Sequence, residues 1–186
     1  FTIVVSPANY APVIKVDNID VSSTPVTMVE DNASSFPLTV SRLSATDQDD
    51  DNATLVWSVY TNASDGNATV EDNGTAPSSV TFTPNPDFNG TDSFVLKVTD
   101  ARGAFDTLTV HITVTNVNDG PLINDGNATI ALSVTEENAT TIAVNLLVAT
   151  DVDTMGSGLT WSVLLGASNG AAVVSGAGNS PVTFTY

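Results

Sequence analysis

Apolar and polar residues alternate along several short segments of the chain. In residues 108–114 every second position is Leu, Val or Ile, so one face is apolar and the other carries threonines and His111. Alternation with a period of two is typical of a strand that buries one face. Segments 55–59, 80–82 and 94–98 are the other clear strand predictions. His111, the only histidine, falls on the polar face, which favours a surface position over a catalytic role.

Turn residues separate these segments. Residues 101–104, Ala-Arg-Gly-Ala, predict a tight hairpin between the last two strands. Residues 84–87 and 89–90 carry the Pro, Asn, Asp and Gly that are typical of loops. Ser, Thr and Val are abundant, whereas Lys, Arg, Glu and Leu, which favour helices, are scarce. The chain is therefore predicted to be all-β.

Most of this pattern occurs twice along the chain. Residues 1–5 match residues 110–114, an offset of 109, and residues 80–83 match residues 182–185, an offset of 102. The Trp-Ser-Val sequence that begins at Trp57 returns at Trp161. A period of just over 100 residues, filled with short alternating segments, is typical of a seven-stranded sandwich domain. Both tryptophans are predicted to lie in a core.

The repeat divides the chain into three parts. Residues 1–11 are predicted to hold the last strand and linker of a preceding repeat, residues 12–117 a complete sandwich, and residues 118–186 a second repeat that stops before its final hairpin. Two explanations stay open. Either the chain is a piece of a longer array, or residues 1–5 of one subunit add to the open second domain of another and build a fibre.

Charge and composition exclude several classes of partner and of chemistry. The 186 residues contain 21 acidic and 4 basic side chains, so the net charge is −17, and nucleic acid and anionic membranes are poor partners. Cysteine is absent, which excludes disulfides and thiolate chemistry. No apolar run is long enough to cross a bilayer, and residues 1–5 do not resemble a signal peptide, so we expect neither within this sequence.

Three motifs follow one another in a recognisable order. They are Asp47-Gln48-Asp49, then Thr99-Asp100-Ala101-Arg102-Gly103, then Asn116-Val117-Asn118-Asp119-Gly120-Pro121. The chain thereby resembles the cadherin and cadherin-like tandem repeats of extracellular adhesins, which carry a DxD, a TDxxG and a DxNDxAP linker in this order. Residues 82–94 resemble the repeats of large bacterial surface proteins. The resemblance covers nearly the whole chain and implies tandem Ig-like, cadherin-like Greek-key β-sandwiches that bind Ca²⁺ between domains.

The resemblance also implies which side chains would bind calcium. At the junction inside the chain they are Glu30, Asn116, Asn118, Asp119, Asp151 and Asp153, and at the upstream junction they are Asp47, Asp49 and Asp100. The second copy has no counterpart of Asp100, and the upstream linker has Tyr10 where the internal linker has Asp119. The cadherin acidic pair in mid-repeat is missing, so we expect one or two ions per junction. The alternative is that these acids are solvated turn residues.

A second set of candidate sites consists of sequons for N-glycosylation. Eight Asn-x-Ser/Thr sequences occur, about twice the chance number, at Asn32, Asn52, Asn62, Asn67, Asn73, Asn89, Asn127 and Asn138. Asn62, Asn67 and Asn73 fall in a polar stretch that is predicted to be an exposed loop or edge. Accidental matches in a Thr-rich chain are the alternative.

No enzyme is expected. The sequence contains no phosphate-binding glycine loop and no nucleophile elbow, and a glycosidase pair, Asp87 with Asp92 or Asp47 with Asp49, is the remaining catalytic alternative. The predicted function is an extracellular, secreted or cell-surface adhesin or stalk segment made rigid by calcium. The alternative is a subunit of a glycosylated extracellular fibre that assembles head to tail. Predicted partners are neighbouring repeats or identical subunits, and a cell-surface protein or glycan.

Overall fold

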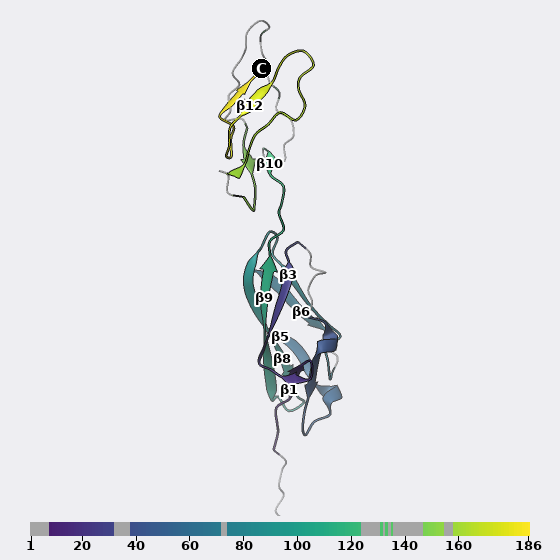
Figure 1. The fold of residues 1–186 in the computed structure, drawn as a ribbon. Coiled ribbons are helices and arrows are strands. Elements are labelled where there is room, and N and C mark those ends of the chain that lie inside the picture. The colour runs from purple at the N-terminus through teal and green to yellow at the C-terminus, as the bar shows by residue number, and fades with distance from the viewer. Residues whose placement is uncertain are drawn as a thin grey trace, which may run out of the picture. The chain divides into compact units, whose positions relative to one another are not determined.

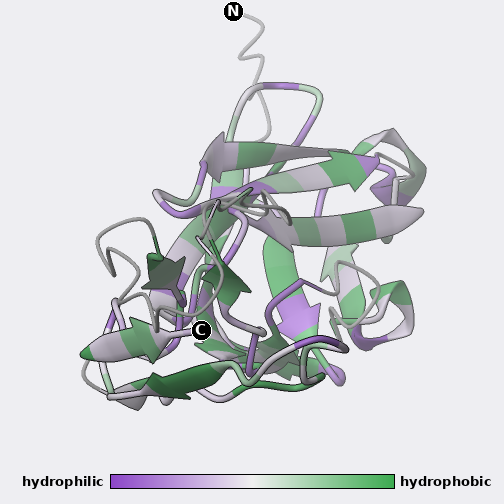
Figure 2. Ribbon diagram, turned by 90° about the horizontal axis from the view of Figure 1, so that it is seen from above, coloured by the Kyte–Doolittle hydropathy of each residue, from purple (hydrophilic) through white to green (hydrophobic). Residues whose placement is uncertain are grey.

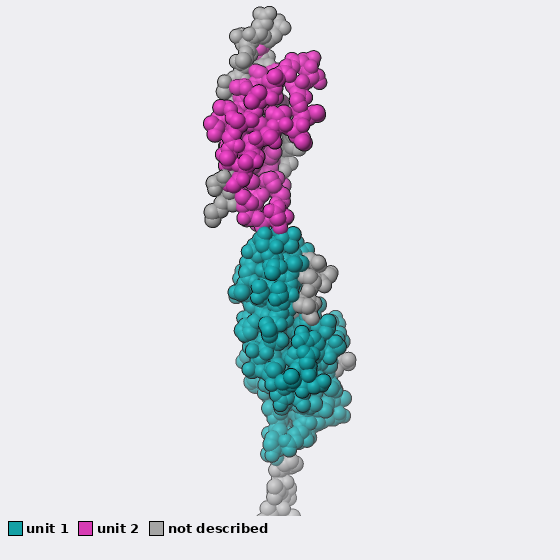
Figure 3. Space-filling view, viewed as in Figure 1, with its two compact units in different colours: residues 1–117 teal, residues 118–186 magenta. Residues whose placement is uncertain are grey.

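The computed structural model describes residues 8–31, 38–71, 74–123, 131, 133, 135, 147–154 and 158–186. The chain forms two compact units, residues 1–117 and residues 118–186, which Figure 3 colours separately. We describe each unit by itself. Residues 1–5, the strand predicted to belong to a preceding repeat, lie outside the described residues.

One layer of the first unit is a four-stranded sheet (Figure 1). Its strands, in spatial order, are β3 (Ser23–Val29), β9 (Phe105–Thr115), β8 (Gly90–Thr99) and β5 (Val56–Thr61). Strand β3 runs parallel to β9, and the other two pairings are antiparallel. The strand predictions at residues 55–59, 94–98 and 108–114 are confirmed. The predicted hairpin at residues 101–104 joins β8 to β9, where the N–H of Asp100 donates to the carbonyl of Ala104 at 2.9 Å.

The facing layer is made of shorter strands. Strand β1 (Val13–Val16) pairs with β2 (Ile19–Asp20) and with β4 (Leu43–Thr46), and β6 (Gly66–Glu71) pairs with β7 (Ser79–Pro84). Two 3₁₀ turns, η2 (Val40–Arg42) and η3 (Asn52–Thr54), lie on either side of β4 in the sequence. The architecture is the predicted all-β sandwich.

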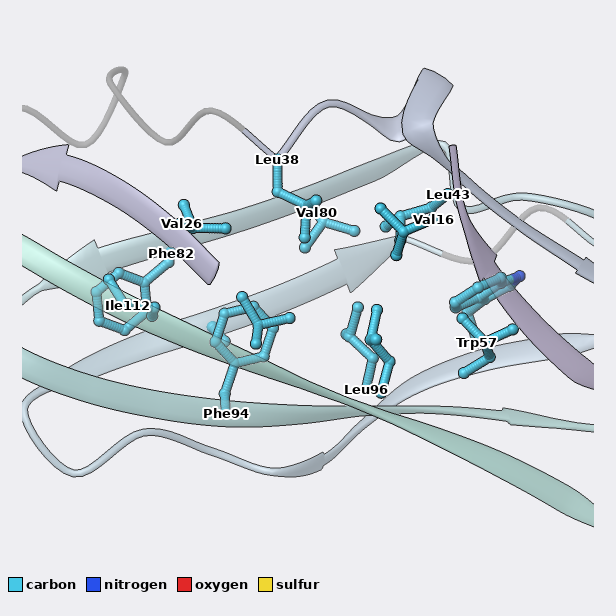
Figure 4. Close-up of a cluster of buried hydrophobic side chains, with 14 of the residues drawn as sticks. Val16, Val26, Leu38, Leu43, Trp57, Val80, Phe82, Phe94, Leu96 and Ile112 are labelled. Carbon is cyan, nitrogen blue, oxygen red and sulfur yellow. The ribbon is translucent and has the colours of Figure 1, made fainter. Parts of the chain in front are cut away.

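Alternate positions of these strands meet between the layers. Leu108, Val110, Ile112 and Val114 of β9 are buried, whereas His111 is exposed on the outer face of the sheet, as the alternation predicts. Figure 2 shows the corresponding bands of hydrophobic and hydrophilic residues along the strands. In the core, the rings of Phe82 and Phe94 stack with centroids 6.1 Å apart (Figure 4). Burial of such alternating apolar faces is the main force that holds a sandwich together.

Trp57 also lies in this core, and its one polar side-chain atom has a hydrogen-bond partner. Its side chain is 3% exposed, and Nε1 donates to the carbonyl oxygen of Gly74 at 2.8 Å. Gly74 has a φ of +62°, a conformation that glycine adopts without strain. Its lack of a Cβ matters too, because a Cβ there would lie 2.9 Å from the carbonyl oxygen of Ala53.

The second unit repeats this arrangement with fewer buried residues. Strand β10 (Leu122–Ile123) pairs with β11 (Ala149–Thr150), and β12 (Val173–Ser175) pairs with β13 (Thr183–Thr185). Trp161 Nε1 donates to the carbonyl of Gly178 at 2.9 Å, the same bond as that of Trp57 at an offset of 104, the difference between 161 and 57. Trp161 is only partly buried, so the prediction of a second core tryptophan holds less well than the first.

The pairing of β12 with β13 corrects one sequence match. Val174 lies opposite Phe184, as Val70 lies opposite Val80 in the first unit. Phe184 is therefore equivalent to Val80, at the same offset of 104, and not to Phe82. The match of residues 80–83 to residues 182–185 is therefore wrong by two positions. A shift of two positions leaves each side chain on the same face of the strand, so the alternation of apolar and polar residues does not reveal it.

We expect Phe82→Ala to lower the free energy of unfolding of the first unit by about 3 to 5 kcal/mol, because it leaves a cavity opposite Phe94. Phe105→Ala is the matched control, since Phe105 is 50% exposed and its ring lies near Tyr60 and Lys97 on the surface. It should cost about 1 kcal/mol. Urea denaturation of both variants measures the difference, and equal losses would contradict this description of the core.

Candidate functional site

The first acidic loop follows β4 and is organised by its own side chains. Asp47 Oδ1 accepts hydrogen bonds from the backbone N–H groups of Asp49 and Asp50, both at 2.9 Å. Asn52 Oδ1 in turn accepts from the N–H of Asp47 at 2.6 Å. Aspartate and asparagine commonly order turns in this way. The loop therefore has a fixed backbone that projects several carboxylates.

Asp100 joins this loop from the hairpin between β8 and β9. It is 5% exposed, and its Oδ1 accepts from the N–H groups of Arg102 at 2.9 Å and Ala104 at 2.8 Å. The segment before β1 connects the two, because Asn9 Nδ2 donates to Asp100 Oδ2 at 2.9 Å and the N–H of Tyr10 donates to Asp49 Oδ1 at 3.1 Å. The three upstream candidates, Asp47, Asp49 and Asp100, thus belong to one network. We call it the first acidic cluster.

A guanidinium group lies in the first acidic cluster. Arg102 Nη2 is 2.8 Å from Asp49 Oδ2 and 2.9 Å from Asp50 Oδ1. Burial raises the pKa of Asp47, but the N–H groups of Asp49 and Asp50 and the positive charge of Arg102 outweigh it and hold that pKa below its ordinary value of 3.8. Asp47 is accordingly ionised at neutral pH.

Glu30, directly after β3, is the most enclosed acid of the first unit. It is 2% exposed, and its Oε1 accepts from the N–H of Val117 at 2.6 Å. Its Oε2 is buried and has no hydrogen-bond partner. A buried carboxylate oxygen left in this way is costly unless a cation or water satisfies it.

Two further carboxylates of the first unit come close together. Asp31 follows Glu30, Asp87 precedes β8, and their ligand oxygens lie within 4.8 Å of each other. Both residues have positive φ, +56° and +60°, so an L-residue is held there in a conformation it rarely adopts. The sequence analysis did not propose either as a ligand. Asn116, which it did propose, accepts a hydrogen bond from Asn89 Nδ2 at 2.8 Å.

The second acidic cluster, Asp119, Asp151 and Asp153, belongs to the second unit. Asp151 Oδ1 accepts from the N–H groups of Asp153 at 3.0 Å and Thr154 at 2.6 Å, as Asp47 does in the first unit. Asp153 Oδ2 accepts from the N–H of Asp119, just as Asp49 accepts from Tyr10. Asp153 Oδ1 is buried and has no hydrogen-bond partner. Asn118 Nδ2 donates to the carbonyl of Asp119 at 2.8 Å, so its side chain orders the linker.

These donor sets fit a hard divalent cation. Every candidate ligand atom is an oxygen, and carboxylates with one oxygen fixed by an N–H and the other unpartnered recur at Glu30, Asp47 and Asp153. Ca²⁺ takes six to eight oxygen ligands at flexible geometry, whereas zinc prefers nitrogen and sulfur. The sequence has no cysteine, and His111 lies on the sheet face away from these loops.

The glycosidase alternative receives no support from the geometry. Asp92 Oδ2 accepts from the N–H of Asp65 at 2.7 Å, and Oδ1 accepts from the N–H groups of Ser64 and Ser93, so this side chain orders the turn before β6. Asp87 groups instead with Asp31. Asp47 and Asp49 are both engaged in the first acidic cluster.

The comparison with family models gives one match. The model described as "Bacterial Ig domain" matches residues 9–113, more than half of the chain. The chain belongs to the bacterial Ig domain family. A search of the curated proteins finds no match to this bacterial Ig domain chain. Among the described residues, no helix is both long and apolar enough to cross a bilayer.

Solved cadherin structures have the same fold. A human CDH23 EC21-23 structure superposes with a TM-score of 0.56 at 17% identity and covers 91% of this chain and 53% of its own. Cadherin domains 1-4 of protocadherin gamma B7, named as extracellular, give 0.52 at 18% identity, covering 94% and 40%. Mouse cadherin-23 EC22-24 gives 0.51 at 16%, covering 96% and 54%. This bacterial Ig domain chain therefore has the fold of cadherin repeats, and it spans about half the length of these structures.

Half of the sequons can be placed. Asn52 begins η3, Asn62 follows β5, Asn67 lies in β6 and Asn89 precedes β8. Asn32, Asn73, Asn127 and Asn138 lie outside the described residues. Asn62, Asn67 and Asn89 are exposed, and Asn52 is partly buried because its side chain bonds to Asp47.

Acid should destabilise the first unit of this bacterial Ig domain chain through Asp47. A carboxyl with a lowered folded-state pKa adds stability above its unfolded pKa, and this is lost as the pH falls from about 4 through the folded-state pKa. NMR titration of the Asp47 carboxyl should give a midpoint below 3.8. Asp47→Asn should also weaken the dependence of unfolding free energy on pH below about 4. A midpoint at or above the ordinary value contradicts the assignment.

Proposed function

We propose that this chain is part of an extracellular array of cadherin-like modules whose acidic loops bind Ca²⁺, and that the bound ions order the loops and the linker between modules. The observation that carries the proposal is Glu30, which is buried, ionisable and has one oxygen without a hydrogen-bond partner. Domains of this fold are typically adhesive or structural rather than enzymatic.

The candidate ligands lie next to the connecting segment in the sequence. Glu30 accepts a hydrogen bond from the N–H of Val117, and Asn116, Asn118 and Asp119 flank Val117 in the linker. An ion held by linker residues limits the conformations of the linker itself, because each coordinated oxygen fixes part of the backbone. Carboxylates that repel one another without metal become mutual ligands with it.

Location and partners follow from the same chemistry. Weak calcium sites with dissociation constants of about 10⁻⁴ to 10⁻³ M are typical of extracellular modules, where free calcium is high. The named extracellular domains of similar fold support a secreted or cell-surface location. Partners are then neighbouring repeats or identical subunits, and a surface protein or glycan. The fibre alternative depends on residues 1–5, and no described contact favours it.

Calcium should stabilise the parent chain by about 1.4 to 2.7 kcal/mol for each ion at about 10 mM, given the affinity above. Glu30→Gln should abolish the part of this effect that belongs to the Glu30 site. It keeps an acceptor for Val117 but removes the buried charge, so in chelator it should be as stable as the parent or more stable. Differential scanning calorimetry of both proteins, in calcium and in chelator, measures these differences. Magnesium at equal ionic strength is included for comparison.

Glu71→Gln is the matched control for this substitution, because Glu71 is exposed in β6. It should leave the calcium response unchanged. A parent chain whose melting temperature and small-angle scattering do not change on chelation would contradict the proposed function. So would a Glu30→Gln variant that responds to calcium as the parent does.

Among the described sequons, Asn67 should be the better glycosylation site. Asn62 Nδ2, the atom that would carry the sugar, donates to Asn67 Oδ1 at 2.8 Å, and Asn62 Oδ1 accepts from the N–H groups of Ala63 and Ala68. Asn67 is exposed on β6 and needs no such bond to be broken. In protein from its native source, peptide mass mapping with cleavage at Asp65, which separates the two sites, should find higher occupancy at Asn67. Eight unmodified asparagines would contradict glycosylation altogether.

A further inference from the structure

The two acidic clusters share a hydrogen-bond frame but differ at one oxygen. Asp49 and Asp153 are equivalent, and each has one carboxylate oxygen bonded to a linker N–H, that of Tyr10 or of Asp119. The other oxygen of each is buried and has no hydrogen-bond partner, but that of Asp49 lies 2.8 Å from Arg102 Nη2 in an ion pair. A cation therefore already occupies one of two otherwise matching positions.

Arg102 is held in place by the hairpin that carries it. Its own N–H donates to Asp100 Oδ1, and the following residue, Gly103, has a φ of +93° and completes the turn. From there the guanidinium reaches the carboxylates of Asp49 and Asp50 and also the carbonyl of Asp49, at 3.2 Å. The two carboxylates are only 17% and 14% exposed, so solvent screens them less than it screens an ordinary surface pair.

The second acidic cluster has a different composition. Thr154 follows Asp153 where Asp50 follows Asp49, so one of the two carboxylates that pair with Arg102 has no equivalent there. Residues 118–186 contain no lysine and no arginine.

We propose that Arg102 is a built-in counter-cation that takes the place of a divalent ion in the first acidic cluster. This cluster is then ordered without metal and binds calcium weakly. The inference rests on the proposed function only for calcium binding at this cluster. The ordering of the first cluster by Arg102 stands apart from it.

The size of the effect follows from Coulomb's law. A divalent ion bound about 5 Å from a guanidinium is repelled by about 1.7 kcal/mol even at the dielectric constant of water, which is more than tenfold in affinity. Arg102→Gln should therefore bind calcium at this cluster at least about tenfold more tightly than the parent. In chelator it should be less stable, because Asp49 and Asp50 then lose the guanidinium group that pairs with them.

The experiment reads the first unit alone. In a Trp161→Phe, Glu30→Gln background, Trp57 is the sole tryptophan and the Glu30 site is removed, so Trp57 fluorescence during thermal unfolding follows the first unit and its first acidic cluster. Arg102→Gln is compared with Arg42→Gln, a matched control that removes the same charge from the exposed pair with Asp17. Arg102→Lys tests whether charge alone suffices. Each protein is melted in chelator and over a calcium titration.

We expect Arg102→Gln to melt several degrees below Arg42→Gln in chelator and to recover in calcium, with a midpoint concentration about one tenth that of the parent background. Arg102→Lys should stay close to that background. If Arg102→Gln and Arg42→Gln behave alike in both conditions, the inference is overturned, whatever calcium does at Glu30. If Arg102→Gln alone is destabilised in chelator while no protein responds to calcium, the counter-cation role stands and calcium binding at the first acidic cluster is contradicted, whereas the proposed function is tested by the parent chain with Glu30 intact.

Discussion

The excess of carboxylates over cations constrains every loop of this chain. With 21 acidic and 4 basic side chains, most acids have no partner of opposite charge within the protein. Three of the basic residues, Lys15, Arg42 and Arg102, make ion pairs, and Lys97 lies over the rings of Tyr60 and Phe105. Acids that are partly buried at strand ends must therefore be satisfied by backbone N–H groups, by water or by an external ion. The positions of these acids reflect the need for all three kinds of partner.

The sandwich makes such clusters possible because it fixes where strands end. Alternating apolar residues bury one face of β8 and β9, and the hairpin between them then places Asp100 beside the loop that follows β4. At the other end of β9, the chain lies beside Glu30, the residue that directly follows β3. Holding like charges close together raises the free energy of the folded state, and burial of the core offsets this. An isolated loop would have no such compensation.

Alternation and the internal repeat predict the strands, the hairpin and the outward position of His111, because these depend on period and spacing alone. The resemblance to cadherin repeats names Asp47, Asp49 and Asp153, which lie in a short local motif, as candidate ligands. It does not find Asp31 and Asp87, since their proximity joins two loops far apart in the sequence and needs a left-handed backbone at both. The sequence shows Arg102 in the turn motif at residues 99–103, but the direction of its side chain is a tertiary property.

In both units the frame of each acidic loop is made by N–H donors that bind one oxygen of a carboxylate and leave the other available. The frame is the same at Asp47 and Asp151, and again at Asp49 and Asp153, even though the surrounding charges differ. Geometry and charge can therefore vary separately within one fold. One residue in the neighbouring hairpin, Arg102, places a positive charge beside the open oxygen of Asp49, while the N–H donor that holds the other oxygen is the same in both units.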